Sequence, residues 1–250
     1  LMSANLSAIL YLISGVLFIL ALRGLSSPET SRQGNLFGIV GMIIAISVTF
    51  LSVGNFTTGF IYVLIFLAIG GSIGAFIAYK IPMTAMPELV AGFHSLVGLA
   101  AVFVAISAFI NPEAFNLGTP GNIKLASLIE MAIGVSVGAI TFSGSVIAFL
   151  KLQGIMSGAP ITFRGQHLLN ASILILIIIL TFYLCSTQSS NLFWILIGIS
   201  FLIGFLIIIP IGGADMPVVI SLLNSYSGIA AAATGFLISN NALIISGSLV

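Results

Sequence analysis

Long apolar runs alternate with short polar or proline-containing breaks along the whole sequence. About 20 apolar residues of helix cross a hydrocarbon core of about 30 Å, and most of these runs have that length. The runs do not alternate polar and apolar residues as barrel strands do, so they predict an all-α, polytopic transmembrane helical bundle. The expected spans are residues 5–22, 35–53, 59–78, 87–110, 125–150, 168–184, 192–210 and 217–238, with a ninth, truncated span that begins at Ala242.

Composition excludes a water-soluble globule. Hydrophobic residues make up 60% of the chain and charged residues 4%, which is too few charges to cover a solvated surface. A formal net charge of +1 argues against a nucleic-acid partner. The single Cys185 excludes an internal disulfide and a cysteine metal site.

The loop charges predict an orientation. If the N-terminus lies outside, a single basic residue, Lys124, falls in the outer loops. The basic residues of the inner loops are then Arg23, Arg32, Lys80, Lys151 and Arg164. This asymmetry follows the positive-inside rule. The first run has no basic n-region or cleavage site, so we expect a true span and not a signal peptide. Since Val250 falls about halfway through a crossing, we expect the native polypeptide to continue towards the inside.

An internal repeat relates two of the expected spans. Residues 85–101 match residues 215–231 at a constant offset of 130 positions, with His94 opposite Asn224. The identical pairs are Met86/Met216, Pro87/Pro217, Ser95/Ser225, Gly98/Gly228, Ala100/Ala230 and Ala101/Ala231. Proline is well placed in the first turn of a helix, where its missing N–H costs nothing. The pattern predicts two parallel helices that both start at the inner side.

His94 and Asn224 lie seven residues beyond their prolines, about 10 Å along a helix and near mid-bilayer. His94 is the only ionisable residue deep in any expected span, and such groups are costly enough in a membrane to indicate function. Imidazole also changes charge near physiological pH, which suits a proton carrier. We expect the two side chains to share one cavity, in direct or water-mediated contact. The alternative is a packing histidine and an asparagine that merely bonds neighbouring helices.

Glu130 lies near the outer end of the fifth span. Small and hydroxyl-bearing residues continue its helical face inwards, namely Gly134, Gly138, Thr141 and Ser145. The face predicts an outer mouth for a proton path. The alternative is an interfacial carboxylate favoured by the helix dipole near a helix start.

Two further acids lie at the inner starts of the repeated spans. Asp215 sits in the glycine-rich corner of residues 212–217, where we expect a coupling role towards a cytoplasmic domain. Glu88 reads as an ordinary acid of a helix N-terminus.

Several catalytic patterns are missing from the sequence. Residues 70–74, GGSIG, fall inside an apolar run with no strand before them, so they indicate helix packing and not a nucleotide loop. We find no Walker loop, paired carboxylates at catalytic spacing, Ser-His-Asp set or metal cluster. The residues therefore favour movement of a proton or ion. The competing classes are a secondary transporter or cation/proton antiporter, which also uses repeats and a midplane polar site, and a structural membrane anchor.

Three runs resemble the beta-subunit membrane domain of the proton-translocating NAD(P) transhydrogenases. They are MPELVAGFHSLVGLAAV (86–102), GAITFSGSVIAFLKL (138–152) and IGGADMPVVISLLNSYSGIAAAATGF (211–236). The resemblance implies an enzyme that couples proton translocation to hydride transfer between NADH and NADP+. It also implies that NAD(H) and NADP(H) bind outside this chain segment, on an alpha subunit and on a domain that follows the beta-subunit helices.

The same resemblance assigns roles to four residues. His94 matches the family's proton-channel histidine, Asn224 its neighbouring asparagine, Glu130 the acid of the fifth span, and Asp215 the acid that communicates with the NADP(H) domain. The implied partners are the alpha subunit, the chain's own NADP(H) domain and the lipid bilayer, in a homodimeric assembly of alpha–beta units. We expect the bacterial cytoplasmic membrane, with the N-terminus outside, in preference to the mitochondrial inner membrane.

Overall fold

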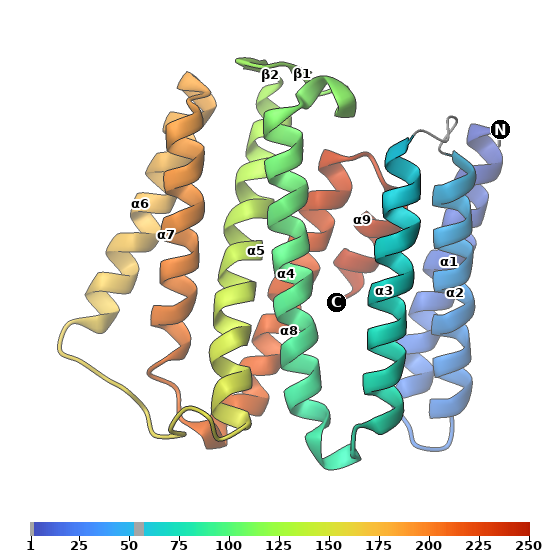
Figure 1. Cartoon of the computed structure of the whole chain (residues 1–250), viewed down its shortest axis with the longest axis horizontal. Helices are drawn as coiled ribbons and strands as arrows, with labels where there is room; N and C mark the ends of the chain where they lie inside the picture. Colours follow the sequence, from blue (N-terminus) through green and yellow to red (C-terminus); the bar gives the residue numbers. More distant parts are fainter. Residues whose placement is uncertain (1–2, 53–57) are drawn as a thin grey trace. The chain divides into compact units, whose positions relative to one another are not determined.

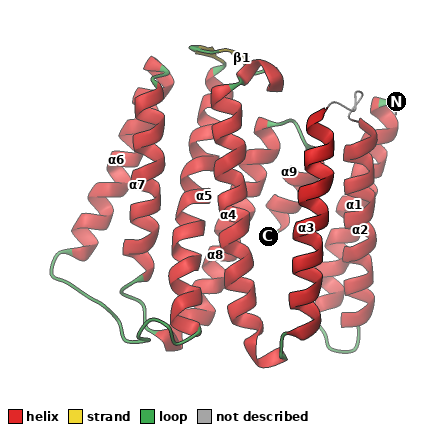
Figure 2. Cartoon of the chain, viewed as in Figure 1, coloured by secondary structure: helices red, strands yellow, loops and turns green. Residues whose placement is uncertain are grey.

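The computed structural model describes residues 3–52 and 58–250, and nearly all of them are helical (Figures 1 and 2). The helices are α1 (Ala4–Leu25), α2 (Ser31–Ser52), α3 (Thr58–Lys80), α4 (Met86–Ile110), α5 (Leu125–Leu152), α6 (Gln166–Thr187), α7 (Ser190–Ile208), α8 (Met216–Leu237) and α9 (Asn241–Leu249). Eight helices in this part of the chain, α1 to α8, are long and apolar enough to span a membrane. The predicted all-α transmembrane bundle is confirmed.

Each predicted span coincides with one helix, and the observed ends differ by a few residues. The expected end of the second span at residue 53 lies outside the described residues. Short elements that the sequence pattern did not predict join the helices. They are the 3₁₀ turns η1 (Met83–Ala85), η2 (Pro112–Phe115) and η3 (Gly213–Asp215) and the strands β1 (Gly118–Thr119) and β2 (Asn122–Ile123).

The chain divides into two compact units, Leu1–Met86 and Pro87–Val250. In the first unit α1 and α2 form a hairpin whose backbones nearly touch. A Cβ atom on Gly24 would lie 2.6 Å from the Cα atom of Gly34, so only glycine fits there. The buried Ser14 hydroxyl donates to the carbonyl of Gly41 at 2.7 Å, which satisfies a polar group between the two helices.

The second unit is built around α5. Of the most apolar 18-residue window of this helix, 61% is buried, against 39% or less in the other spans. Helices α7 and α8 pack along α5, α6 packs mainly on α7, and α9 packs on α8. Helix α4 lies on α5 through Gly98 and Gly138. The arrangement surrounds α5 with apolar contacts and explains why its own face carries so many small residues.

A β-hairpin closes one end of this unit, here called the hairpin end (Figure 1). Strands β1 and β2 pair antiparallel, with Gly118 opposite Ile123. The side chain of Gln188, at the end of α6, bonds both backbone groups of Ile123: the N–H donates to Oε1 at 2.8 Å, and Nε2 donates to the carbonyl at 3.0 Å. The side chain of Gln188 therefore joins the hairpin to the end of α6 through two hydrogen bonds, as a neighbouring strand would do.

Candidate functional site

His94 lies on α4 and makes its hydrogen bond to α8. Its Nδ1 atom is 3.2 Å from the hydroxyl oxygen of Ser227. The ring is half-buried, and its other nitrogen, Nε2, is buried without a hydrogen-bond partner among the described residues. One ring nitrogen is thus fixed and the other is available.

Asn224 lies one helical turn before Ser227 on α8. It is half-buried, and its amide makes no hydrogen bond within the described residues. The repeat placed Asn224 opposite His94, whereas the hydrogen bond goes to the residue three positions further along α8. The structure shows no direct hydrogen bond between His94 and Asn224. Their predicted common cavity remains a prediction. Sequence reasoning missed Ser227, although its spacing of three from Asn224 puts it on the same helical face.

The face of α5 turned to α4 carries a second unpartnered polar atom. A Cβ atom on Gly98 would lie 3.0 Å from Thr141 Cβ, and one on Gly92 would lie 3.8 Å from Phe149 Cδ2. The two contacts fix an antiparallel register that places Ser145 level with His94. Ser145 is fully buried, and its hydroxyl has no hydrogen-bond partner in the described part of the chain. Buried polar atoms without partners are rare in native proteins, and two of them occur here at one level.

Glu130 is half-buried on α5 and lines a cavity of about 510 Å³. The cavity is bounded by α5, α8 and α9 and reaches Ser225, the residue after Asn224. Gly134 and Gly138, which continue the Glu130 face, instead lie against neighbouring helices. This middle part of the predicted stripe is therefore a packing surface, and the open space beside Glu130 follows α8.

The opposite end of the unit, here called the Lys151 end, carries Asp215. Its carboxylate is exposed in η3, directly before α8, and makes no hydrogen bond in the described residues. The backbone around it is fixed, because Gly213 donates its N–H to the carbonyl of Gly158 at 2.8 Å. A free carboxylate on an anchored turn is suited to contact with another domain.

Lys151 anchors the same end from within. Its ammonium group donates to the carbonyls of Ile209 at 2.7 Å and Ile211 at 2.6 Å, and to that of Ala159 at 3.5 Å. The residue is 4% exposed and lies in the last turn of α5, although the loop-charge pattern placed it among the basic residues of the inner loops. Ile209 and Ile211 directly follow α7, where carbonyls lack helical partners, and Ala159 lies between α5 and α6. No side-chain pattern in the sequence indicates such a site.

Glu88 fits the ordinary interpretation of a helix-start acid. It lies in the first turn of α4, and its carboxylate accepts a hydrogen bond from the amide of Gln153, which follows α5. The contact joins two helix ends at the Lys151 end and leaves Glu88 without a chemical role.

The two repeated segments have the same local backbone. Each starts with an extended residue, Pro82 or Gly212, followed by a 3₁₀ turn and then a helix that begins at Met86 or Met216. These landmarks keep the 130-residue offset found in the sequence. The two segments therefore share the backbone conformation that leads into each helix, and not only identical side chains.

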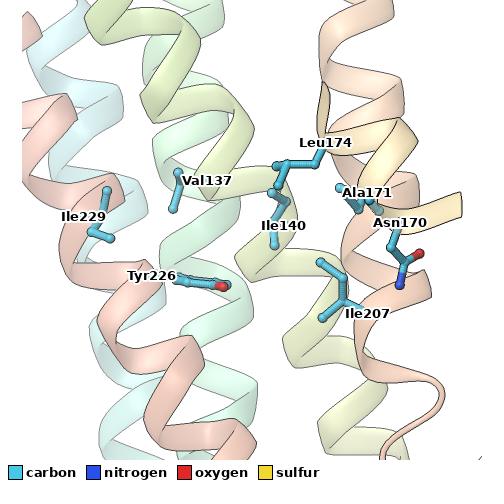
Figure 3. A pocket seen from close by; sticks show the side chains of 9 residues that line it. Val137, Ile140, Asn170, Ala171, Leu174, Ile207, Tyr226 and Ile229 are labelled. Atoms are coloured by element: carbon cyan, nitrogen blue, oxygen red, sulfur yellow. The ribbon is translucent and has the colours of Figure 1, made fainter. Parts of the chain in front are cut away.

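A separate cavity of about 360 Å³ lies on the α6 side of α5. Figure 3 shows Tyr226 and Ile229 of α8 on one side of it and Asn170 and Leu174 of α6 on the other. Its lining is almost wholly aliphatic, and none of the four predicted site residues borders it.

The described residues show no strand–loop–helix unit of the kind that binds a nicotinamide dinucleotide. Residues 70–74 lie within α3, with no strand leading into them. Strands β1 and β2 have two residues each and form a hairpin, not the strand–loop–helix unit that cradles a pyrophosphate. The described residues also contain no group of three or more His, Cys, Asp or Glu side chains that could hold a metal.

Residues 7–250 match the model of the NAD(P) transhydrogenase beta subunit family. The chain belongs to this family. It is 55% identical over 249 residues to the NAD(P) transhydrogenase subunit beta of Rhodospirillum rubrum, and equally similar to that of a named strain of the species. These matches cover 100% of this chain and 53% of each relative. The chain thus spans about half the length of the curated relatives it matches.

Membership in the beta-subunit family agrees with the resemblance drawn from the three sequence runs. It identifies the bundle as a membrane component of a transhydrogenase, which the eight apolar helices among the described residues also support. The family match identifies the class of protein and does not assign roles to single residues.

Proposed function

We propose that this bundle is the proton-translocating domain of an NAD(P) transhydrogenase and couples proton movement to hydride transfer between NADH and NADP+. One observation carries the proposal. His94 is an ionisable side chain inside a membrane-spanning helix, its Nδ1 is bonded to Ser227 of α8, and its Nε2 is buried without a hydrogen-bond partner among the described residues. An ionisable side chain inside a membrane is energetically costly, so a mere packing role is unfavourable. Imidazole changes charge near physiological pH, which suits a proton carrier.

The proposed path crosses the second unit. With the N-terminus outside, as the loop charges favour, the hairpin end faces outwards and Glu130 stands at the entry. The cavity beside Glu130 extends to Ser225, next to Asn224. Asn224 can bond either protonation state of a nearby imidazole, because its amide both donates and accepts. His94 then passes the proton towards the Lys151 end, where Asp215 faces the nucleotide-binding part of the enzyme.

The hydride transfer itself is proposed to take place elsewhere. The relatives are about twice as long as this chain, and the NADP(H)-binding domain of the proposed enzyme would lie in the part of that length that this chain does not span. An alpha subunit would bind NAD(H), and two alpha–beta units would form the assembly. The proposed location is the bacterial cytoplasmic membrane. Within this scheme the chain's own residues bind and release a proton and carry none of the nucleotide chemistry.

A secondary transporter or antiporter is the competing function. Such proteins build their midplane sites from interrupted helices whose free ends hold the ion or substrate. Both α4 and α8 are continuous across their described lengths. The site consists of the imidazole of His94 and a few hydroxyl and amide groups near it. The arrangement favours proton exchange.

The test uses the complete alpha–beta enzyme in sealed lipid vesicles. We expect His94→Ala to assemble and bind both nucleotides, yet to lose proton uptake. Its coupled hydride-transfer rate should fall by about 100-fold or more, as for loss of an acid–base group. His167→Ala is the matched control, since the second histidine is exposed at the start of α6. A His94→Ala enzyme that pumps protons at the control rate would overturn the proposal.

A further inference from the structure

We propose that Ser227 is a positioning residue that keeps a proton on Nδ1 of His94, so that Nε2 is the nitrogen that takes up and releases the translocated proton. The inference rests on the proposed function of His94 and adds to it the atom that reacts and the residue that selects it.

The hydrogen bonds of the Ser227 hydroxyl decide the direction of donation. The oxygen lies 3.0 Å from the carbonyl of Leu223, one turn back on α8, and 3.2 Å from Nδ1 of His94. A hydroxyl has one proton to donate, and a carbonyl can only accept. With that proton given to Leu223, the bond to His94 forms only if Nδ1 carries a hydrogen and donates it to the serine oxygen. In the neutral ring Nε2 is then the bare nitrogen.

The surroundings of Nε2 agree with this assignment. The atom is buried and has no hydrogen-bond partner among the described residues. Its lone pair is therefore free to bind a proton. Ser145 of α5 lies at the same level, and its buried hydroxyl also has no partner in the described chain. A hydroxyl there could accept from Nε2–H or donate to bare Nε2, so it suits both states.

The proton step leaves the Ser227 bond intact. An incoming proton adds to the Nε2 lone pair and forms an imidazolium, and the same N–H bond breaks when the proton leaves. Nδ1–H donates to Ser227 before, during and after this exchange. The ring therefore keeps one orientation while only Nε2 changes state. Without the serine oxygen, the neutral ring can place its hydrogen on Nε2 instead, which removes the acceptor from the path.

Nitrogen NMR of the full alpha–beta enzyme, labelled with ¹⁵N-histidine in lipid bilayers, reads the tautomer directly. The His94 signals are assigned by their loss in His94→Gln. For the neutral ring we expect a protonated Nδ1 and a bare Nε2, and in Ser227→Ala a shift towards the opposite tautomer. The coupled rate should fall about tenfold in Ser227→Ala and recover in Ser227→Thr, which restores the hydroxyl.

Ser200→Ala is the matched control. Ser200 is fully buried on α7 and donates to Leu196 at 2.7 Å in the same i to i−4 pattern as Ser227, and it has no other hydrogen-bond partner in the described part of the chain. We expect it to change neither the His94 signals nor the coupled rate.

Two results would overturn the inference. One is a wild-type enzyme whose neutral His94 carries its proton on Nε2. This measurement does not depend on the folding of any variant. The other is a Ser227→Ala enzyme with the wild-type tautomer and rate. Either can occur while His94→Ala still abolishes pumping, whereas normal pumping by His94→Ala would instead refute the proposed function.

Discussion

Gly98 of α4 and Gly138 of α5 meet so closely that a Cβ atom on Gly98 would lie 2.5 Å from the carbonyl oxygen of Gly138. The two atoms nearest to that Cβ belong to the backbone of α5, so a side-chain rotation cannot relieve the clash. His94 lies one turn from Gly98 on α4, so this contact sets how near its ring comes to α5.

The contact predicts a sharp penalty for added volume. Gly98→Ala should lower the thermal stability of the solubilised protein, by about 1–3 kcal/mol for an overpacked core, and reduce coupled turnover. Gly198→Ala is the control, since a Cβ added there on α7 would meet no neighbouring side chain or helix within 4 Å among the described residues. Equal melting temperatures for the two variants would show that α4 and α5 are not in this close contact.

Lys151 gives a second prediction about stability. Lys151→Met keeps much of the side chain's volume but removes the ammonium donor from the carbonyls of Ile209 and Ile211. Ile209 keeps the N–H of Ile161 at 3.4 Å, so we expect a loss of about 1–3 kcal/mol, mainly from the carbonyl of Ile211. Thermal unfolding measures the effect. Lys124→Met removes one bond, at 3.2 Å, from an exposed lysine and should change the melting temperature little. A Lys151→Met protein as stable as Lys124→Met would contradict the buried anchor.

Glu130 should matter for proton entry and not for folding. Its carboxylate makes no hydrogen bond in the described residues and lines the cavity that reaches Ser225. We expect Glu130→Gln to retain its melting temperature and to slow proton uptake in vesicles. Glu113→Gln is the matched control, because Glu113 is exposed in the η2 turn of the hairpin end. Normal pumping by Glu130→Gln would remove this residue from the path.

Asp215 is predicted to act on the nucleotide side. Because its carboxylate is exposed and unbonded within the described chain, Asp215→Asn should fold normally and still alter NADP(H) affinity or coupled turnover in the complete enzyme. Nucleotide titration and steady-state rates measure the two effects. Glu29→Gln, in the exposed α1–α2 turn, should change neither. Unchanged affinity and rate in Asp215→Asn would exclude a coupling role.

The helices were readable from the sequence because lipid imposes a single strong rule on their length and composition. Residue 87 was predicted to open the fourth span and α4 begins at Met86. The hairpin of Gly118 to Ile123 was not readable, because its strands have two residues each and its main support is the side chain of Gln188, 65 positions away.

The site was readable only in part. His94 stood out because a lone ionisable group in a span is costly. Its partner did not, since the repeat aligns His94 with Asn224, while the side chain bonds one turn further along α8, at Ser227. Lys151 counted as a loop charge because the carbonyls of Ile209 and Ile211 that bind it belong to backbone and leave no residue pattern.

The response of the reaction to an imposed pH gradient shows whether protons pass through His94. The complete enzyme is reconstituted in sealed vesicles, and NADPH formation from NADH and NADP+ is followed with and without a gradient. We expect the gradient to accelerate the wild type and His167→Ala, and to leave the residual rate of His94→Ala unchanged. A His94→Ala enzyme accelerated by the same factor as the wild type would contradict a proton path through His94.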